Sequence, residues 1–116
     1  MSSRAKAIGT RWESAIVTYL NEHGDHHAER LVQTGSSDQG DIRVGDFILQ
    51  ARDRAQIDLS GSVDDGHTQL LNYQRGHTGT DAKYSVAVIK RRRRGTAEGY
   101  VVMTLDQFAD IVEELA

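Results

Sequence analysis

The chain has 116 residues, of which 38% are hydrophobic and 27% are charged, with a formal net charge of −3 and no cysteine. This length suits one domain with a modest core, and no apolar run approaches the roughly 18–20 residues of a membrane-spanning helix. A disulfide framework, a thiolate zinc site and a secretory signal are also excluded, so we expect a cytoplasmic protein that does not bind membranes.

The first part of the chain predicts a flexible tail followed by a helix. We expect residues 1–7 to be the tail and residues 10–23 to be helical, because four side chains recur at helical spacing. They are Trp12, Ile16, Tyr19 and Leu20. Thr10 can cap this helix, and Glu13 follows three residues later, as in a capping box.

Three short strands are predicted next. The first covers residues 29–33, and a polar loop follows it up to Gly40. Residues 41–44 and 47–52 then form a hairpin with Gly45 and Asp46 at its turn.

The second half predicts a helix over residues 58–73, a buried strand over 84–89, a strand over 100–103 and a final helix capped by Thr104. We expect this final helix to bury one apolar stripe, which consists of Leu105, Phe108, Ile111, Val112 and Leu115. The order of elements predicts a single α/β domain over residues 1–116, with a mixed sheet of about five strands flanked by helices.

The hairpin carries the clearest chemical signal. Asp41 opens its first strand, and Gln50 and Arg52 end its second strand. Residues two apart on a strand share a face, so Gln50 and Arg52 project together from an otherwise apolar run. An acid beside a polar and cationic pair is suited to holding a divalent metal against a phosphate.

Five consecutive cations form a second signal. Although the net charge is negative, phosphate binding depends on local positive potential, and this basic segment supplies it. It consists of Lys90, Arg91, Arg92, Arg93 and Arg94. A solvated hairpin loop is the alternative interpretation. The five histidines have no spacing that favours a metal site.

In the order of these elements and the placement of its polar residues, the chain resembles the PD-(D/E)xK nuclease superfamily. The likeness covers residues 8–112 and is greatest to the small Holliday-junction resolvases and their phage and actinobacterial relatives. It rests on Glu13 in Arg-Trp-Glu, on Asp41 in Gly-Asp-Ile and on Gln50-Ala51-Arg52. It implies a restriction-endonuclease-like core.

The resemblance also implies roles for these residues. Asp41 corresponds to the family's central metal ligand, and Glu13 to the glutamate of the first helix. Gln50 and the carbonyl of Ala51 would complete the shell of a Mg²⁺ ion, for which Mn²⁺ is a possible substitute. Arg52 would oppose charge on the phosphate, and Lys90–Arg94 would hold the DNA backbone. Gln69 matches a polar position that faces the site.

Two departures from the family pattern bear on activity. The family usually has Asp or Glu where this chain has Gln50, and lysine where it has Arg52. Glutamine can still ligate a hard cation, but a guanidinium is effectively never deprotonated and cannot act as a general base.

Each candidate residue also has a structural interpretation. Glu13 can serve only the helix cap, Asp41 can be an ordinary turn acid, and Gln50 and Arg52 can be the exposed face of an edge strand.

The leading hypothesis is therefore a Mg²⁺-dependent, structure-selective DNA endonuclease, specifically a homodimeric Holliday-junction resolvase of a phage or bacterial host, associated with the nucleoid. The alternatives are a DNA-binding protein that keeps the nuclease fold with weakened catalysis, and a restriction-type or mismatch endonuclease.

Overall fold

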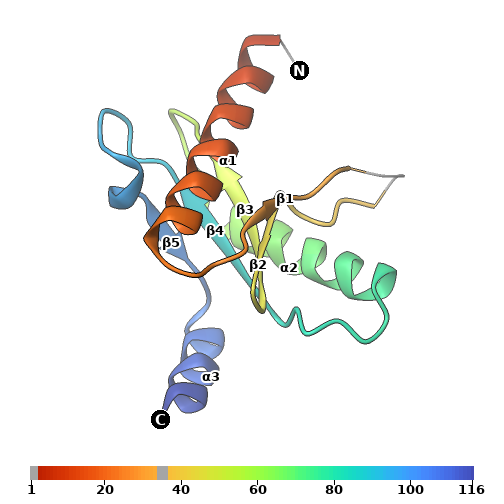
Figure 1. The fold of residues 1–116 in the computed structure, drawn as a ribbon. Coiled ribbons are helices and arrows are strands. Elements are labelled where there is room, and N and C mark those ends of the chain that lie inside the picture. The colour runs from red at the N-terminus through yellow and green to blue at the C-terminus, as the bar shows by residue number, and fades with distance from the viewer. Residues whose placement is uncertain (1–2, 34–36) are drawn as a thin grey trace.

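The structure is a computed structural model that describes residues 3–33 and 37–116. Its elements in chain order are α1 (Ser3–His23), β1 (Glu29–Arg30), β2 (Ile42–Val44), β3 (Phe47–Arg52), α2 (Leu59–Gly76), β4 (Tyr84–Ile89), the 3-10 helix η1 (Thr96–Glu98), β5 (Tyr100–Val102) and α3 (Leu105–Leu115). The predicted α/β architecture with a mixed five-stranded sheet is confirmed (Figure 1). None of the described helices is long and apolar enough to cross a membrane.

The strands lie in the order β1-β2-β3-β4-β5, and β3 and β4 are the parallel pair among them. Parallel neighbours need a crossover connection, which α2 provides. The register pairs Phe47 with Tyr84 at one end and Arg52 with Ile89 at the other. The carboxyl ends of β3 and β4 therefore reach the same edge of the sheet.

Helices α1 and α2 cover opposite faces of the sheet, because Ile48 and Leu49 are neighbours on β3 and point in opposite directions. Leu49 belongs to the core that Trp12 and Ile16 of α1 form with β4. Ile48 packs instead with α2, in the second cluster. The indole Nε1 of Trp12 donates to the carbonyl of Val88 at 3.0 Å, which fixes α1 on β4.

The boundaries of the first elements differ from the prediction. Helix α1 begins at Ser3, so Thr10 lies inside the helix and the predicted capping box is wrong. The expected tail overlaps the first turns of α1 at residues 3–7, and its residues 1–2 lie outside the described part. Strand β1 is only two residues long, and the side chain of Val32 is exposed. Residues 34–36 of the expected polar loop are not described.

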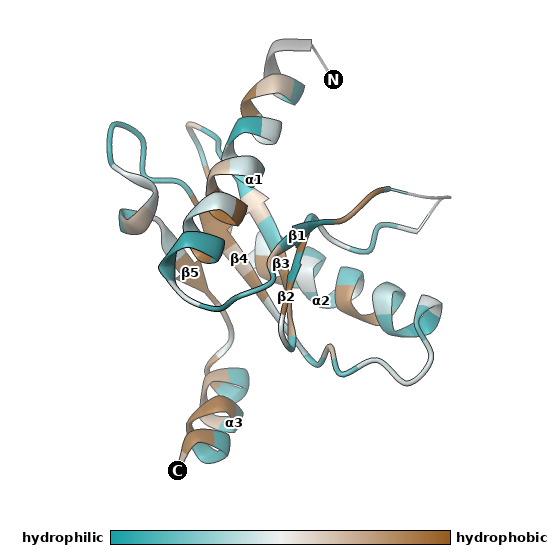
Figure 2. Ribbon diagram, viewed as in Figure 1, coloured by the Kyte–Doolittle hydropathy of each residue, from teal (hydrophilic) through white to brown (hydrophobic). Residues whose placement is uncertain are grey.

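Helix α3 is correctly predicted in its position and its cap, since Thr104 Oγ1 accepts from the backbone N–H of Gln107. The predicted burial of its apolar stripe is wrong. Leu105 and Leu115 are 80% and 83% exposed, and Phe108 and Val112 are about half exposed, at 51% and 49%. Helix α3 extends away from the sheet after β5, and its apolar face is visible in Figure 2.

Helix α3 is held at the start of β4 by polar contacts. The side-chain amide of Gln107 donates to the carbonyl of Ser85 at 2.8 Å and accepts from its N–H at 3.0 Å, which continues the ladder where β5 ends. Glu114 accepts from the hydroxyl of Tyr84 and pairs with Lys83. Because these contacts use polar atoms, they leave the apolar face of α3 uncovered.

Candidate functional site

The candidate site lies where β3 and β4 end side by side. The backbone N–H of Lys90 donates to the carbonyl of Arg52 at 2.9 Å, so the basic segment begins directly beside the polar pair of β3. In α/β sheets, ligands bind at the carboxyl ends of parallel strands. Arg52 and Lys90, which are 38 residues apart in the sequence, therefore lie side by side at the carboxyl ends of the two parallel strands.

Asp41 is fixed at this edge by the neighbouring strand. Its backbone N–H donates to the carbonyl of Leu49 at 3.0 Å, and its Oδ2 accepts from the N–H of Ala51 at 2.8 Å. Gly40 precedes it with a φ of +96°, and a Cβ there would lie 2.4 Å from Cγ2 of Ile48. Only glycine therefore allows the chain to enter β2 so closely. The carboxylate binds across to β3, which a simple turn acid would not do.

The surroundings of Asp41 disfavour its charge. Burial raises the pKa of its carboxyl from 3.8 to about 6, although the hydrogen bond from Ala51 opposes this rise. The negative charge of Glu13 raises the pKa further, the positive charge of Arg52 lowers it, and the negative charge of Asp38 adds to the rise. The ionised form of Asp41 therefore has too little positive charge around it to stabilise it, and a bound cation would supply that charge.

Arg52 lies beside Asp41 but is engaged with other groups. Its Nη1 donates to the carbonyl of Ala51 at 3.2 Å, and its Nη2 lies 3.4 Å from Oδ2 of Asp65 on α2. Burial and the nearby charge of Arg54 lower the pKa of the guanidinium, which nonetheless stays protonated at any ordinary pH. Asp65 is mostly exposed, so this ion pair holds Arg52 only weakly.

Gln50 lies deeper than expected. Strand β3 is central, so the edge-strand interpretation is wrong, and the Gln50 side chain is 1% exposed beneath α2. Its Oε1 accepts no hydrogen bond from the described residues. A Cβ at Gly66 would lie 3.8 Å from this oxygen and 3.7 Å from Oγ of Ser85, which also lacks a partner in the described part. Gly66 thus lets α2 approach these two polar groups.

Glu13 reaches Asp41 from the opposite side of the sheet. It lies on α1, whereas Gln50 and Arg52 share the α2 face with Ile48. Its Oε1 accepts from Nε of Arg30 at 3.2 Å, and Nη2 of the same guanidinium also lies at 3.2 Å. Of the predicted residues, the structure therefore brings Glu13 and Arg52 into electrostatic range of Asp41. It places Gln50 under α2.

Asp38 is a site residue that the sequence did not reveal. Its Oδ2 accepts from Nε2 of Gln69 at 2.8 Å, and its Oδ1 accepts from the N–H of Gly40 at 2.9 Å. Gln69, which the family resemblance matches to a polar position facing the site, is 4% exposed, and its Oε1 has no partner among the described residues. A Cβ at Gly40 would lie 3.6 Å from this Oε1. Gln69 therefore approaches the segment that leads into Asp41.

The fit of a divalent cation can be judged from these donors. Within residues 3–33 and 37–116, no group of three or more His, Cys, Asp or Glu side chains is arranged to hold a metal. The carbonyl of Ala51 already accepts one hydrogen bond, from Nη1 of Arg52. What remains is the carboxylate of Glu13 on the α1 side of Asp41 and the amide oxygens of Gln50 and Gln69 on the α2 side. All are hard donors of the type Mg²⁺ prefers, but they lie on opposite faces of the sheet. The donor chemistry fits Mg²⁺, but no acidic cage is preformed.

The basic segment is folded back on the protein by its own contacts. Arg92 and Arg94 form ion pairs of 3.1 Å with Asp53 and Glu98 respectively. Arg91 lies over the ring of Tyr100, and Lys90 lies over the ring of Trp12. The segment is therefore a structured loop at the site's edge, and its contact with DNA stays a prediction.

Comparisons of the chain with protein-family models, with characterised proteins and with solved structures give no match.

The raised pKa of Asp41 predicts how stability depends on pH. Because the pKa is higher in the folded state, the contribution of this residue favours folding below pH 3.8 and is lost as the pH rises through about 6. Asp41→Asn keeps an oxygen for the Ala51 N–H. It should therefore stabilise the protein at pH 8, by about 1 to 3 kcal/mol, and much less at pH 4. Urea denaturation at both values measures this.

The control is Asp25→Asn, which changes an exposed carboxylate beyond the end of α1. It should give the same free energy of unfolding as the wild type at both pH values. Destabilisation by Asp41→Asn at pH 8 would show that the ionised carboxylate is well accommodated and would contradict this electrostatic description.

Proposed function

We propose that the protein is a Mg²⁺-dependent endonuclease acting on branched DNA, specifically a Holliday-junction resolvase. The observation that carries the proposal is the partly buried Asp41, with its raised pKa, beside Arg52 at the edge where the basic segment begins. In this arrangement, a carboxylate that a bound cation would stabilise lies next to positive side chains that can contact a phosphate.

Each residue has a distinct part in this proposal. Asp41 and Glu13 would hold Mg²⁺, and water would complete its shell. Bound there, the ion would supply a Lewis acid and lower the pKa of water. Arg52 would leave Asp65, to which it is weakly paired, and neutralise charge on the scissile phosphate. Lys90–Arg94 would contact flanking phosphates, which positions the DNA without reading its sequence.

A DNA-binding protein that keeps the nuclease fold is the second candidate. It is favoured by the neutral Gln50 beneath α2 and by Arg52, whose guanidinium already binds the Ala51 carbonyl. Arginine cannot take a proton from water as a lysine of lowered pKa could. In this case the cationic edge would bind branched DNA without cutting it.

We propose further that the protein acts as a homodimer through the exposed face of α3. A four-way junction has two equivalent strands to cut, which a two-fold assembly matches. The exposed apolar residues of α3 follow a 3-4-3 spacing, which is typical of a helix that packs on another helix. They are Leu105, Phe108, Val112 and Leu115.

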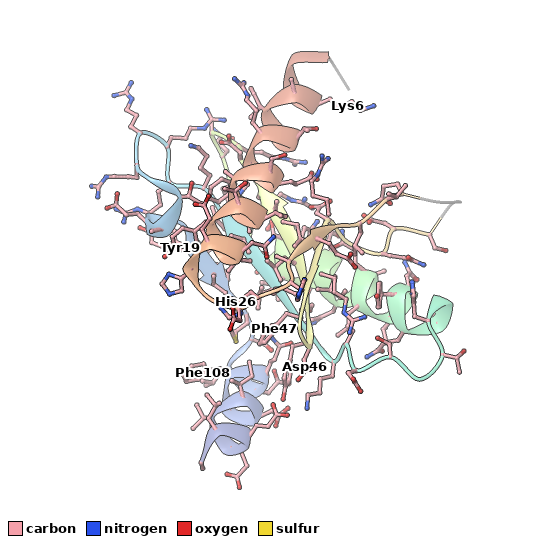
Figure 3. All side chains as sticks on the ribbon, in the orientation of Figure 1. Lys6, Tyr19, His26, Asp46, Phe47 and Phe108 are labelled. Carbon is pink, nitrogen blue, oxygen red and sulfur yellow. The ribbon has the colours of Figure 1, made fainter. Side chains whose placement is uncertain are left out.

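The distribution of charge on α3 favours a second copy of the chain as the occupant. The positions flanking the apolar seam are Ala109 and Ile111. All four acids of α3 lie away from the seam, so two copies can pair without bringing like charges together. They are Asp106, Asp110, Glu113 and Glu114. Phe108 projects from α3 in Figure 3.

The endonuclease proposal predicts paired nicks in a synthetic four-way junction when Mg²⁺ or Mn²⁺ is present. Asp41→Asn should lower cleavage at least about a hundredfold, because it removes the central anionic ligand, while leaving binding in Ca²⁺ intact. Denaturing gels measure cleavage, and gel shifts measure binding. Asp25→Asn is the control for cleavage. Wild-type rates in Asp41→Asn would remove Asp41 from the chemistry.

Two further arms of this experiment separate the alternatives. Arg52→Lys should raise cleavage if the protein is a weakened nuclease. If neither protein cuts at any metal concentration while both bind the junction, the DNA-binding candidate replaces the proposal. Equal cutting of linear duplex and junction would instead indicate a restriction-type or mismatch endonuclease.

The dimer predicts a particle of twice the 12.9 kDa chain mass in sedimentation or light scattering. Phe108→Ser should convert it to a monomer, since that side chain is central in the seam. Leu71→Ser is the matched control, because Leu71 on α2 is equally exposed, at 52% against 51%, and should leave the mass unchanged. A wild-type monomer at micromolar concentration would contradict this part of the proposal.

A further inference from the structure

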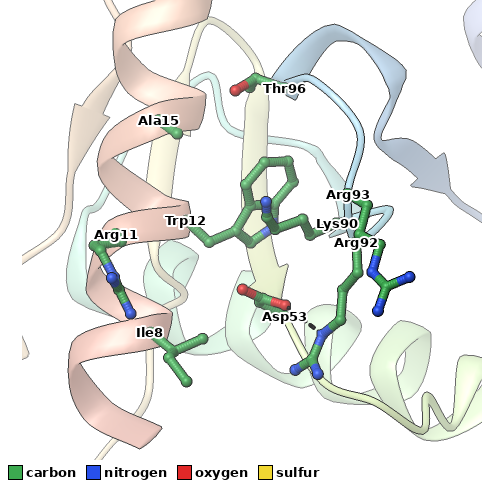
Figure 4. Close-up of a pocket in the computed structure, with 9 residues that line it drawn as sticks. All are labelled: Ile8, Arg11, Trp12, Ala15, Asp53, Lys90, Arg92, Arg93 and Thr96. Carbon is green, nitrogen blue, oxygen red and sulfur yellow. Dashed lines mark hydrogen bonds and ion pairs between the residues drawn. The ribbon is translucent and has the colours of Figure 1, made fainter. Parts of the chain in front are cut away.

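A cleft of about 450 Å³ lies between α1 and the basic segment, next to the candidate site (Figure 4). Its lining residues are Ile8, Arg11, Trp12, Ala15, Asp53, Lys90, Arg92, Arg93 and Thr96. Asp53 follows Arg52 directly, so the cleft begins one residue beyond the end of β3. Its volume lies within the roughly 300–1,000 Å³ of sites that bind small ligands.

The cleft carries a concentrated positive charge from two separate elements. Arg11 comes from α1, and Lys90, Arg92 and Arg93 come from the basic segment. Asp53 is the one carboxylate among the lining residues, and it is paired with Arg92 at 3.1 Å. The formal charge of the lining is therefore +3, which favours an anionic ligand.

The conformation of Arg93 is a second feature of this cleft. Its φ is +67°, and no other non-glycine residue in the described part of the chain has a positive φ. The left-handed conformation costs a side-chain-bearing residue about 1 kcal/mol or more, and such strain concentrates at ligand-binding sites. The loop thus keeps a strained residue among those that line the cleft.

The lining is apolar as well as cationic. Ile8 and Ala15 lie about two turns apart on α1, and Trp12 lies between them as part of the floor. A duplex presents its phosphates on a convex surface and needs neither a hollow nor apolar contacts to bind them. An unpaired nucleotide, which exposes both a phosphate and the face of its base, uses both kinds of lining.

We propose that this cleft binds one nucleotide of an unpaired DNA strand, with its phosphate on the cationic side chains of the lining and its base toward Ile8 and Ala15. The inference rests on the proposed action on DNA and deepens it. An endonuclease with such a cleft would prefer branched substrates because a branch point supplies an unstacked nucleotide at lower cost than a paired duplex does.

The chain has one tryptophan, and it lines this cleft, so its fluorescence reports on binding directly. Deoxythymidine 5′-monophosphate, titrated without divalent metal, should change the fluorescence saturably. Inorganic phosphate and deoxythymidine should each require at least a tenfold higher concentration. Phosphate that binds as well as the nucleotide, or a fluorescence that does not change saturably, would overturn the inference.

Matched variants locate the site. Arg11→Ala and Arg93→Asn should each weaken binding of the nucleotide at least fivefold. Asparagine tolerates a positive φ, so the second variant removes charge without adding backbone strain. Arg75→Ala, at an exposed position on the last turn of α2, should bind like the wild type. Equal loss in this control would show that binding depends only on overall charge and would overturn the inference.

The two proposals fail separately. Asp41→Asn should keep wild-type binding of the nucleotide, since Asp41 does not line the cleft. If no DNA is cut but Arg11-dependent binding is present, the endonuclease proposal fails and the nucleotide cleft stands. If junctions are cut but the nucleotide does not bind, only the cleft inference fails.

Discussion

The hydrogen bond from the Ala51 N–H to the Asp41 carboxylate is the interaction on which the site depends. It holds an acid, already partly buried, against the end of the central strand, where burial raises its pKa to about 6. Gly40 makes this placement sterically possible, since a Cβ would collide with Ile48. The protein therefore maintains a carboxylate whose negative charge is poorly compensated, which a merely structural residue would not require.

The crossover through α2 explains why positive charge gathers at the same place. Because β3 and β4 are parallel, Arg52 and Lys90 emerge together, and the basic segment follows at once. Arg11 adds a further cation from α1, on the other wall of the cleft. The parallel pairing of β3 and β4 thus brings Arg52 and the basic segment next to the acid that would hold a metal, which the β2–β3 hairpin places there.

Much of this could be predicted from the sequence. Periodicity gave the helices and the buried strand β4, and the two-residue spacing placed Gln50 and Arg52 on one face. The prediction failed for α3, because an amphipathic pattern shows that one face is apolar but does not show what covers it. Asp38 was missed because its role depends on Gln69, 31 residues away, and no local pattern links them. Glu13 was expected from its position, but its pairing with Arg30 was not.

The central claim is that Asp41 lacks compensating positive charge until a divalent cation binds. A ¹³C NMR titration of its side-chain carboxyl group tests this directly. We predict a pKa of about 6 in metal-free protein and a clear decrease when Mg²⁺ is added. A pKa near 3.8 that Mg²⁺ leaves unchanged would contradict the claim and the function built on it.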